Sequence, residues 1–479
     1  MKELINNGRK IIYTDIEEVT PENVVDILNQ ALIIHSDNAQ DIDYLWNYYK
    51  GSQPILHRVK NVNSDITNMI VENHANEIVS FKTGYLLQNP IQYVAREDGV
   101  EEEVSKLNQY VFAEDKASKD KEMADWMHIC GLGYRMILPD TRINNPREEG
   151  VPFEIYTLDP RFTFVVYSSG VGHKPILAVT YTVDSNDFQT KHLYAYSDKY
   201  YFEFTDQRLE VFEKHIMKAI PIIEYPLNEE RMGAFEFVLP LLDAINQTAS
   251  DRQDGLDQWI QALLVFKNVD ISAEDYKQIR ELGGLKISDI SPDRKADVKY
   301  IAQELDQGAT QTLIDHQYKT VLRICGVPLM SMSGAGSSDN GVAVELRDGW
   351  SQAEYRAKST ELEWRKSEKQ ALRLFLNICR SAKIINANPI DIEIRFDRWN
   401  HTNLLVKSQV LTTMLGNDKI HPRLAFQASD MFIDPELAYQ ESMEWYENHM
   451  PQEENKQEEN TQGENNAKNI EQELNWRNS

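Results

Sequence analysis

The strongest pattern of apolar and polar positions lies in residues 342–383, where apolar and small residues recur at alternating steps of four and three. This spacing places them on one face of an α-helix, and the opposite face is charged. The stripe consists of Leu346, Trp350, Ala353, Ala357, Thr360, Trp364, Ser367, Ala371, Leu374 and Ile378. We predict one helix from Val342 to Lys383, roughly 60 Å long at 1.5 Å per residue. A helix of this length is typical of a subunit in a larger, radially arranged assembly. The alternative is one long helix within a soluble helical domain.

A glycine-serine segment separates this helix from a shorter amphipathic helix, predicted at 313–324, which Gly326 and Pro328 end. The segment reads Ser331, Met332, Ser333, Gly334, Ala335, Gly336, Ser337, Ser338, Asp339 and Asn340, followed by Gly341. It has almost no apolar side chains, so it cannot bury enough surface to fix one conformation. We predict a mobile loop, which Asp339 or Asn340 closes by capping the next helix.

Residues 1–235 mix helical and strand patterns, which predict one α+β region. Helical periods occur at 21–34, from Asn63 to Gly84, and at 119–129. β-branched and aromatic runs bounded by Gly, Asp and Asn predict strands, most of them in an antiparallel sheet. The strands are expected at 134–138, 162–167, 176–183, 193–196 and 200–204.

A pair of helices, predicted at 236–262 and 305–325, brackets a small α/β insert at 263–304. The insert is expected to contain strands at 264–266, 285–290 and 298–301 and a helix at 272–282. The central turns of the first helix are polar nearly all round, through Gln247, Ser250, Asp251, Arg252, Gln253, Asp254, Asp257 and Gln258. A helix tolerates this when one side meets a neighbouring copy and the other meets water. An exposed, solvent-bridging helix is the alternative.

The last hundred residues begin with a strict alternation of apolar and charged positions at 390–396, which predicts a strand. Helices are expected at 404–415 and 435–446. From Pro451 onward Glu, Gln, Asn and Lys dominate, and this composition predicts a disordered acidic tail.

The 479 residues are 41% hydrophobic, enough for a sizeable core, and carry a formal net charge of -26. That charge argues against a protein that grips nucleic acid by neutralising phosphates, but not against a wall past which nucleic acid slides. The simpler explanation of the negative charge is that it keeps the protein soluble. Cys130, Cys325 and Cys379 have no short spacing, which argues against a disulfide framework or a zinc site and fits a reducing cytoplasm. The sequence shows no signal core and no apolar run of membrane-spanning length.

Taken in order, these segments resemble the portal proteins, or head-tail connectors, of tailed double-stranded-DNA bacteriophages, over most of residues 44–447. The resemblance rests on residues 48–51 with Pro54 and Ile55, 68–79, 84–86, Pro90 and Ile91, 220–225, 241–246 with Ser250, 326–328, and the glycine-serine loop with Gly341, Val342 and Ala343. Each is weak alone, and their order and spacing carry the specificity. Gln88 and Asn89 depart from the family, which often has glycine before the proline, and this departure concerns only the turn at that point.

The resemblance implies a ring of about twelve α+β, mainly helical subunits, each with wing, stem, clip and crown. It implies a wing at 1–235 together with the long helix 342–383, stem helices at 236–262 and 305–325, a clip at 263–304, a tunnel loop at 326–341, a crown at 384–447 and a tail at 448–479. Residues 331–340 would then face DNA, and Gln247, Asp251, Arg252, Asp254 and Gln258 would belong to the channel stem. The implied place is the portal vertex of the virion, and the host cytoplasm during assembly. The implied partners are double-stranded DNA, terminase, scaffolding, capsid and head-tail adaptor proteins, with no membrane.

Two other functions are compatible with parts of the sequence. Asp391, Glu393 and Asp397 near His401 could hold a divalent metal, as in two-metal nucleases, but they also form the polar face of an alternating strand. The glycine-serine loop lacks the Gly-Lys-Ser/Thr ending that holds nucleotide phosphates, so we expect no ATP hydrolysis in this chain. A structural or scaffolding protein other than a portal is the remaining alternative. We therefore predict neither catalysis, nor a cofactor, nor a bound metal.

Overall fold

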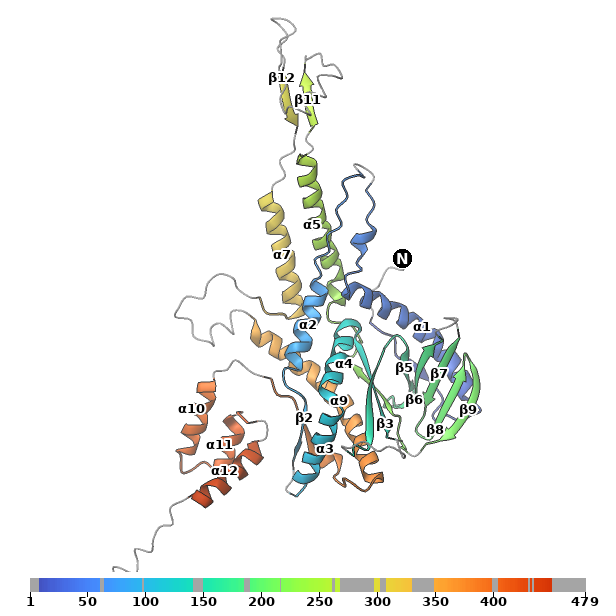
Figure 1. Ribbon diagram of the computed structural model, residues 1–479, viewed down its shortest axis with the longest axis vertical. Helices are drawn as coiled ribbons and strands as arrows, with labels where there is room; N and C mark the ends of the chain where they lie inside the picture. Colours follow the sequence, from blue (N-terminus) through green and yellow to red (C-terminus); the bar gives the residue numbers. More distant parts are fainter. Residues whose placement is uncertain are drawn as a thin grey trace, which may run out of the picture. The chain divides into compact units, whose positions relative to one another are not determined.

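The computed structural model describes residues 8–60, 64–96, 99–140, 150–184, 190–215, 217–260, 263–267, 297–301, 307–329, 349–398, 404–429, 431–432 and 435–449. The chain divides into two compact units, residues 1–399 and 400–479, which are described separately. The first unit is built from helices and strands (Figure 1). Its buried apolar side chains form three hydrophobic clusters. The mixed α+β class expected from the sequence is therefore confirmed.

A six-stranded sheet forms one part of the first unit, in the order β1-β5-β6-β7-β8-β9. The strands are β1 (Ile12–Thr14), β5 (Thr163–Ser168), β6 (Pro175–Val183), β7 (Lys191–Tyr196), β8 (Tyr200–Thr205) and β9 (Arg208–Lys214). All pairings are antiparallel except that of β1 with β5, which is parallel. The predicted antiparallel strands are confirmed, and the sequence pattern missed the two edge strands, β1 and β9.

Helix α1 (Val24–Tyr49) packs its first half against this sheet, where Val24, Ile27 and Leu28 join the same core cluster as Phe164. The predicted helix ended at Ile34. In the structure it continues, because apolar residues recur on the same face up to Tyr48 and join a second cluster.

A three-stranded antiparallel sheet in the order β10-β3-β4 lies at the centre of the first unit. It comprises β3 (Leu132–Pro139), β4 (Phe153–Leu158) and β10 (Ile222–Pro226), and the helices packed nearby are α2 (His74–Leu86), α3 (Glu101–Ala113) and α4 (Lys116–Cys130). Gly131 ends α4 with φ 82°. The sequence pattern missed α3, and it started α2 too early: residues 64–73 are not helical, because their backbone amides bind side chains of a neighbouring helix.

Helix α9 (Trp350–Ser381) is the long helix, and it starts at Trp350 rather than at Val342. Gly349 has φ 87°, a left-handed conformation that an α-helix cannot contain, so the helix cannot extend back through it. Residues 342–348 lie outside the described part. The predicted apolar face is confirmed along α9, where the buried residues include Ala353, Ala357, Trp364, Ser367, Ala371, Leu374 and Ile378.

Four buried charged side chains tie α9 to the central sheet and to α4. Lys116 Nζ lies 2.7 Å from Asp120 Oδ2 and 2.9 Å from Glu368 Oε1. Arg135 on β3 pairs with Asp120 and lies 3.1 Å from Glu368 Oε2. The two positive and two negative groups balance, so no net charge is left in this interior.

Glu368 of α9 is the centre of this cluster. The hydroxyl groups of Tyr93 and Tyr225 donate hydrogen bonds of 2.6 and 2.8 Å to its carboxylate. Burial opposes ionisation of Glu368, but the attraction of Lys116 and Arg135 outweighs it and lowers the pKa of this carboxyl below its ordinary value. The long helix is thus held in one position by directional polar contacts as well as by its apolar stripe.

Strand β13 (Ile392–Arg395) pairs antiparallel with β2 (Gln92–Ala95), so the predicted strand is present. Its apolar side chains, Ile392 and Ile394, are buried in the cluster that contains α9. The predicted crown began at residue 384. In the structure β13 belongs to the first unit, which ends at Trp399.

The second unit contains α10 (Leu404–Leu415), α11 (Pro422–Ser429) and α12 (Pro435–His449). Helices were expected for α10 and α12 and are confirmed, whereas the short α11 was missed. Phe426 of α11 stacks on Phe432 and meets Tyr439 of α12, with ring centroids 5.3 and 5.8 Å apart. Residues 450–479, predicted to be a disordered tail, lie outside the described residues.

Candidate functional site

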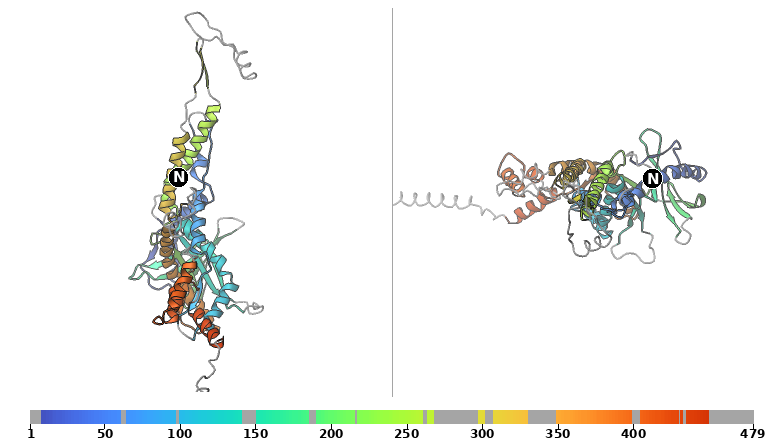
Figure 2. Two further views of the ribbon diagram at one scale, coloured as in Figure 1. Left: turned by 90° about the vertical axis from the view of Figure 1, so that its left-hand side faces the viewer. Right: turned by 90° about the horizontal axis from the view of Figure 1, so that it is seen from above.

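Helices α5 (Leu239–Ile260) and α7 (Gln307–Cys325) lie side by side (Figure 1, Figure 2). Ile245 of α5 shares a hydrophobic cluster with Ile314 and Val321 of α7. Between them in sequence, β11 (Leu263–Lys267) and β12 (Asp297–Ile301) pair antiparallel. We call α5 and α7 the helical hairpin. The predicted helix pair and these two strands are confirmed, and the expected helix 272–282 and strand 285–290 lie outside the described residues.

Buried polar contacts fix the base of the hairpin. Arg9 lies 2.5 Å from Glu236, which directly precedes α5, and both side chains are buried. Glu236 also accepts the backbone N–H of Gly233 at 2.9 Å. Burial raises the pKa of Glu236, although Arg9 acts in the opposite direction. Tyr48 at the end of α1 donates a 2.8 Å hydrogen bond to Asp243, so the first turns of α5 are attached to the sheet-bearing body.

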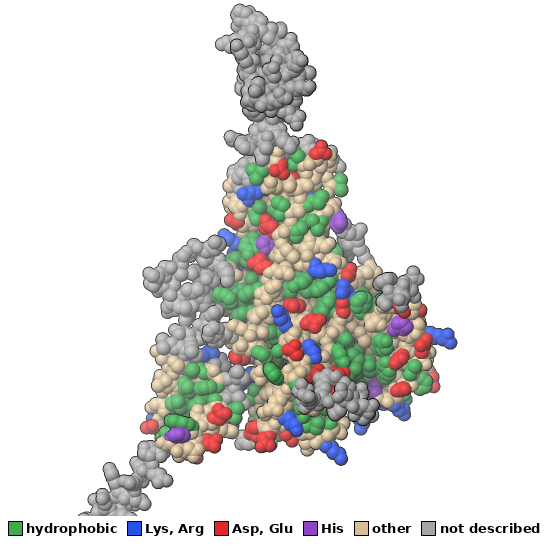
Figure 3. Space-filling view, viewed as in Figure 1, with side chains coloured by type: hydrophobic (Ala, Val, Ile, Leu, Met, Phe, Trp, Pro, Cys, Tyr) green, Lys and Arg blue, Asp and Glu red, His purple; other side chains and the backbone are tan. Residues whose placement is uncertain are grey.

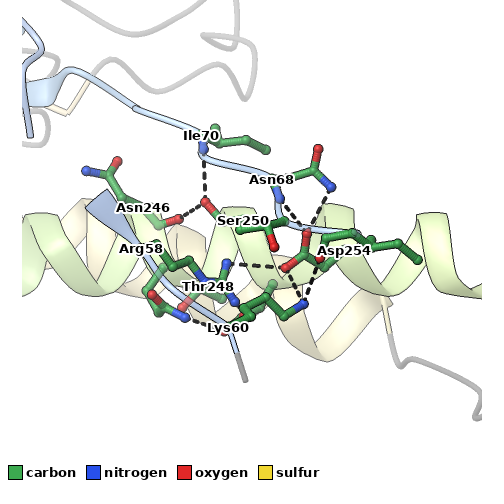
Figure 4. A network of polar contacts seen from close by, with 12 residues as sticks. Arg58, Lys60, Asn68, Ile70, Asn246, Thr248, Ser250 and Asp254 are labelled. Carbon is green, nitrogen blue, oxygen red and sulfur yellow. Dashed lines mark hydrogen bonds and ion pairs between the residues drawn. The ribbon is translucent and has the colours of Figure 1, made fainter. Parts of the chain in front are cut away.

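An extended segment runs along α5, and we call its residues 58–60 and 64–73 the strap. The backbone N–H of Asn68 donates to Asp254 at 2.7 Å, and that of Ile70 donates to Ser250 at 3.0 Å (Figure 4). The backbone N–H of Glu72 donates to Asn246 at 2.8 Å. Every second amide of the strap thus meets every fourth residue of α5, in opposite chain directions.

This match follows from the repeats of the two structures. Two residues of an extended chain advance roughly 6.6 Å, and four residues of an α-helix advance roughly 6.0 Å. A row of short polar side chains four residues apart can therefore accept hydrogen bonds from alternate amides of an extended segment. The strap amides, which would otherwise need a β-sheet partner, are satisfied by side chains of α5.

Asp254 is the electrostatic centre of the strap. It is 2% exposed, and Lys60 lies 2.8 Å and Arg58 3.3 Å from its carboxylate. These cations and the amides of Asn68 reach the carboxylate from opposite sides (Figure 4). Burial raises the pKa of Asp254, but the hydrogen bonds from Lys60 and Asn68 outweigh it, so the pKa lies below its ordinary value.

The predicted channel-stem residues fall into different environments. Gln247 and Asp251 are exposed and joined by a 2.9 Å hydrogen bond, and Arg252 bonds to Gln311 of α7. Asp254 is in the helix as predicted, but the strap covers its carboxylate, so it cannot line a channel. The side chain of Gln258 and the loop residues 331–340 lie outside the described part.

The structure also corrects the interpretation of the polar centre of α5. The side of α5 that carries Asn246, Ser250 and Asp254 does not need a neighbouring copy, because these side chains bind the strap of the same chain. Sequence reasoning missed Arg58, Lys60 and Asn68. The strap could have been predicted from the repeat of short hydrogen-bonding side chains at every fourth residue of α5. This repeat is a more specific pattern than a face that is merely polar.

The alternative metal site finds no support in the geometry of the described residues. Asp391 caps its own short helix through Asn388, and Asp397 accepts a 3.0 Å hydrogen bond from Asn89. His401 lies outside the described part, and within that part no three His, Cys, Asp or Glu side chains gather as metal ligands. The searched helices include none long and apolar enough to cross a membrane.

All three cysteines are free and buried. Burial raises the pKa of the Cys130, Cys325 and Cys379 thiols to about 12 in each case. They are therefore protonated at neutral pH and behave as small apolar side chains.

Comparison with known proteins agrees with this architecture. A family model described as phage portal protein, SPP1 Gp6-like, matches residues 28–462. The helical hairpin, the long helix and this match define a portal-type subunit, a structural component of a virion. The chain belongs to the SPP1 Gp6-like phage portal protein family. No curated protein matches it.

Solved structures similar to the chain include parts of gene transfer agent (GTA) particles. The neck of an empty GTA particle computed with C6 symmetry has 13% identity and a TM-score of 0.44, with 74% of this chain and 89% of that chain covered. The neck of a native GTA particle computed with C12 symmetry has 13% identity and a TM-score of 0.43, with 81% and 93% covered. The virion of a native GTA particle has 14% identity and a TM-score of 0.39, with 78% and 89% covered.

Proposed function

We propose that this portal subunit forms a ring of about twelve copies at one capsid vertex, through which double-stranded DNA is packaged and ejected. The observation that carries the proposal is the helical hairpin, fixed at its base by Arg9 and Glu236 and along α5 by the strap. A hairpin held at so many points can keep its place while a polymer moves past it. Closed rings arise when one surface of a subunit binds a different surface of the next.

The parts of the subunit take the roles that the family implies. Residues up to 235, with α9, form the wing, α5 and α7 form the stem, and the insert with β11 and β12 forms the clip. The crown is proposed for residues 400–447, since β13 belongs to the first unit. Residues 326–341 would be the tunnel loop and 448–479 the acidic tail. Terminase, scaffolding, capsid and head-tail adaptor proteins are the proposed partners, and ATP hydrolysis belongs to the terminase rather than to this chain.

The proposed channel lets DNA slide without gripping it. The formal net charge is -26, and on the face that Figure 3 shows, Lys and Arg side chains are dispersed among acidic ones rather than gathered in one patch. A surface with few clustered cations neutralises few phosphates, so each base-pair step breaks few contacts. We expect weak duplex binding at physiological salt. Nanomolar affinity with a steep salt dependence would contradict this part of the proposal.

Negative-stain images of the purified protein test the proposed assembly most directly. Rings with a central hole, together with a ring-sized mass by light scattering, are the expected result. A chain that remains monomeric at micromolar concentration in low and moderate salt would overturn the proposed ring. Filaments would favour the alternative of a scaffolding protein.

The DNA-facing loop needs its own test. Deleting Ser333–Gly336 should leave ring assembly and thermal stability nearly unchanged, since the loop composition offers little apolar surface to bury. DNA packaging or retention should be impaired. If the deletion abolishes rings and no separate DNA defect can be measured, the loop is a structural connector and its proposed role must be dropped.

A further inference from the structure

A narrow pocket with a volume of about 20 Å³ lies where α2, α4, the end of α7 and α9 meet. Its polar lining includes Lys82 of α2, His128 of α4 and Arg356 of α9. The aliphatic stem of Arg356 packs over Gly326, where a Cβ atom would lie 3.1 Å from Arg356 Cγ. Gly326 follows α7 with φ 69°, and its lack of a side chain leaves room for this close approach.

The charges in this pocket are not balanced. Neither Lys82 nor Arg356 forms an ion pair within the described part of the chain. Burial, together with the nearby positive charge of Arg356, lowers the pKa of Lys82 to about 8. Burial also lowers the pKa of His128 to about 3, so this imidazole is neutral. Glu354, on the same helix, is already bound to Arg398 and to Tyr85.

The size and surroundings of the pocket restrict what can enter. About 20 Å³ admits a group the size of one water molecule or one carboxylate oxygen, whereas small-molecule sites usually have about 300–1,000 Å³, so the pocket excludes a nucleotide. A duplex backbone is too wide for it. On the same helix Tyr355 is 75% and Leu362 is 68% exposed. Large exposed apolar side chains on the helix that contributes to a charged pocket are typical of a surface that another protein covers.

We infer that this pocket receives an Asp or Glu side chain of a neighbouring copy of the chain, which pairs with Lys82 and Arg356. The chain carries 76 acidic and 50 basic residues, so a second copy brings carboxylates in excess. A carboxylate between a guanidinium and an ammonium accepts charge-assisted hydrogen bonds from both, the strongest class available at such a contact. The inference rests on the proposed ring, because it names one contact by which neighbouring subunits bind.

The experiment uses full-length chains, half of them labelled with ¹⁵N, mixed before assembly. A zero-length carbodiimide reagent joins a lysine amine to a carboxylate only when the two are in contact. Mass spectrometry should then find Lys82 of one isotopic chain joined to an acidic residue of the other. Rings in which Lys82 is joined only within its own chain, or to nothing, would overturn the contact and leave the ring itself established.

A variant provides the second measurement. Lys82→Met with Arg356→Gln should raise the concentration needed for assembly about tenfold, whereas Arg373→Gln, an exposed charge on the same helix, should not. The double variant should fold with unchanged or higher thermal stability, since it removes a partly buried cation without a partner. Loss of folding stability with unchanged assembly would mean that the two cations serve the subunit interior, and the inference would fail. Absence of rings in the unmodified chain would overturn the proposed function as well.

Discussion

Replacing Asp254 by Ala is the sharpest test of the strap. The carboxylate accepts hydrogen bonds of 2.7 and 2.9 Å from Asn68 and 2.8 Å from Lys60. After the change the backbone amide of Asn68 loses its acceptor, the ammonium of Lys60 keeps its hydrogen bond to the Ile66 carbonyl but loses its carboxylate, and Arg58 keeps its contact with Asp251. We expect the strap to detach from α5 while the rest of the subunit stays folded.

The magnitude follows from those contacts. A hydrogen bond to a charged group contributes about 1.5–3 kcal/mol, and removal of one partner of a buried ion pair costs about 3–5 kcal/mol. Lys60 retains some access to water, with a side chain 18% exposed, so the lower end applies. A loss of about 3 kcal/mol corresponds to an increase on the order of a hundredfold in the opening of the strap.

Hydrogen exchange resolved to single amides is the suitable assay, because a chain of two units need not unfold in one step. The amides of Asn68, Ile70 and Glu72 should exchange about a hundredfold faster in the variant. Asp251→Ala is the matched control: it also pairs with Arg58, but its side chain is 53% exposed, and such pairs contribute at most about 1 kcal/mol. Equal effects of the two substitutions would refute the assignment of Asp254 as the centre of the strap.

Three further outcomes are expected. Acidification should release the strap, because the pKa of Asp254 is lower in the folded than in the unfolded chain. The stabilisation by its carboxylate is therefore complete above the unfolded pKa of about 3.9 and is lost as the pH falls through the folded pKa. Hydrogen exchange of the Asn68 amide measures this loss. Glu368→Ala should destabilise the subunit by about 3–5 kcal/mol in denaturant titrations, because the buried cations Lys116 and Arg135 then share Asp120 alone and one positive charge is left unbalanced, whereas unchanged stability would contradict the charge balance. Gly131→Ala should lower the melting temperature, since its Cβ would lie 2.2 Å from the Arg231 carbonyl oxygen at φ 82°, and an unchanged value would show that this turn relaxes freely.

The elements predicted best from the sequence are those whose apolar spacing is long and regular. The buried face of α9 matches the predicted stripe from Ala353 to Ile378, because a helix packed along its length repeats one spacing many times. The predicted start of this helix was wrong because the backbone conformation of one residue ends the helix although the apolar spacing continues. Gly349 breaks a continuous helical period by its left-handed backbone, which no apolar spacing reveals.

Long-range pairing was beyond the sequence pattern. The alternation at 390–396 predicted a strand correctly, but not that β13 pairs with β2, far away in the chain, which moves the limit of the first unit to Trp399. The buried ion pairs of Glu368 were missed for the same reason. A glutamate at that position in a helix has the spacing of any surface residue, and only the fold brings Lys116 and Arg135 to it.

The strap shows why a polar helix face is ambiguous in a sequence. Water, a neighbouring copy and a segment of the same chain can all satisfy polar side chains, so polarity alone does not separate them. The spacing of the polar residues does identify a segment of extended chain. An extended backbone presents an amide roughly every 6.6 Å along one side, so its acceptors on a helix must lie about four residues apart. Asn246, Ser250 and Asp254 meet that requirement, whereas Gln247 and Asp251, one position further round, remain exposed. A channel lining, if α5 provides one, must therefore come from the face that carries Gln247 and Asp251.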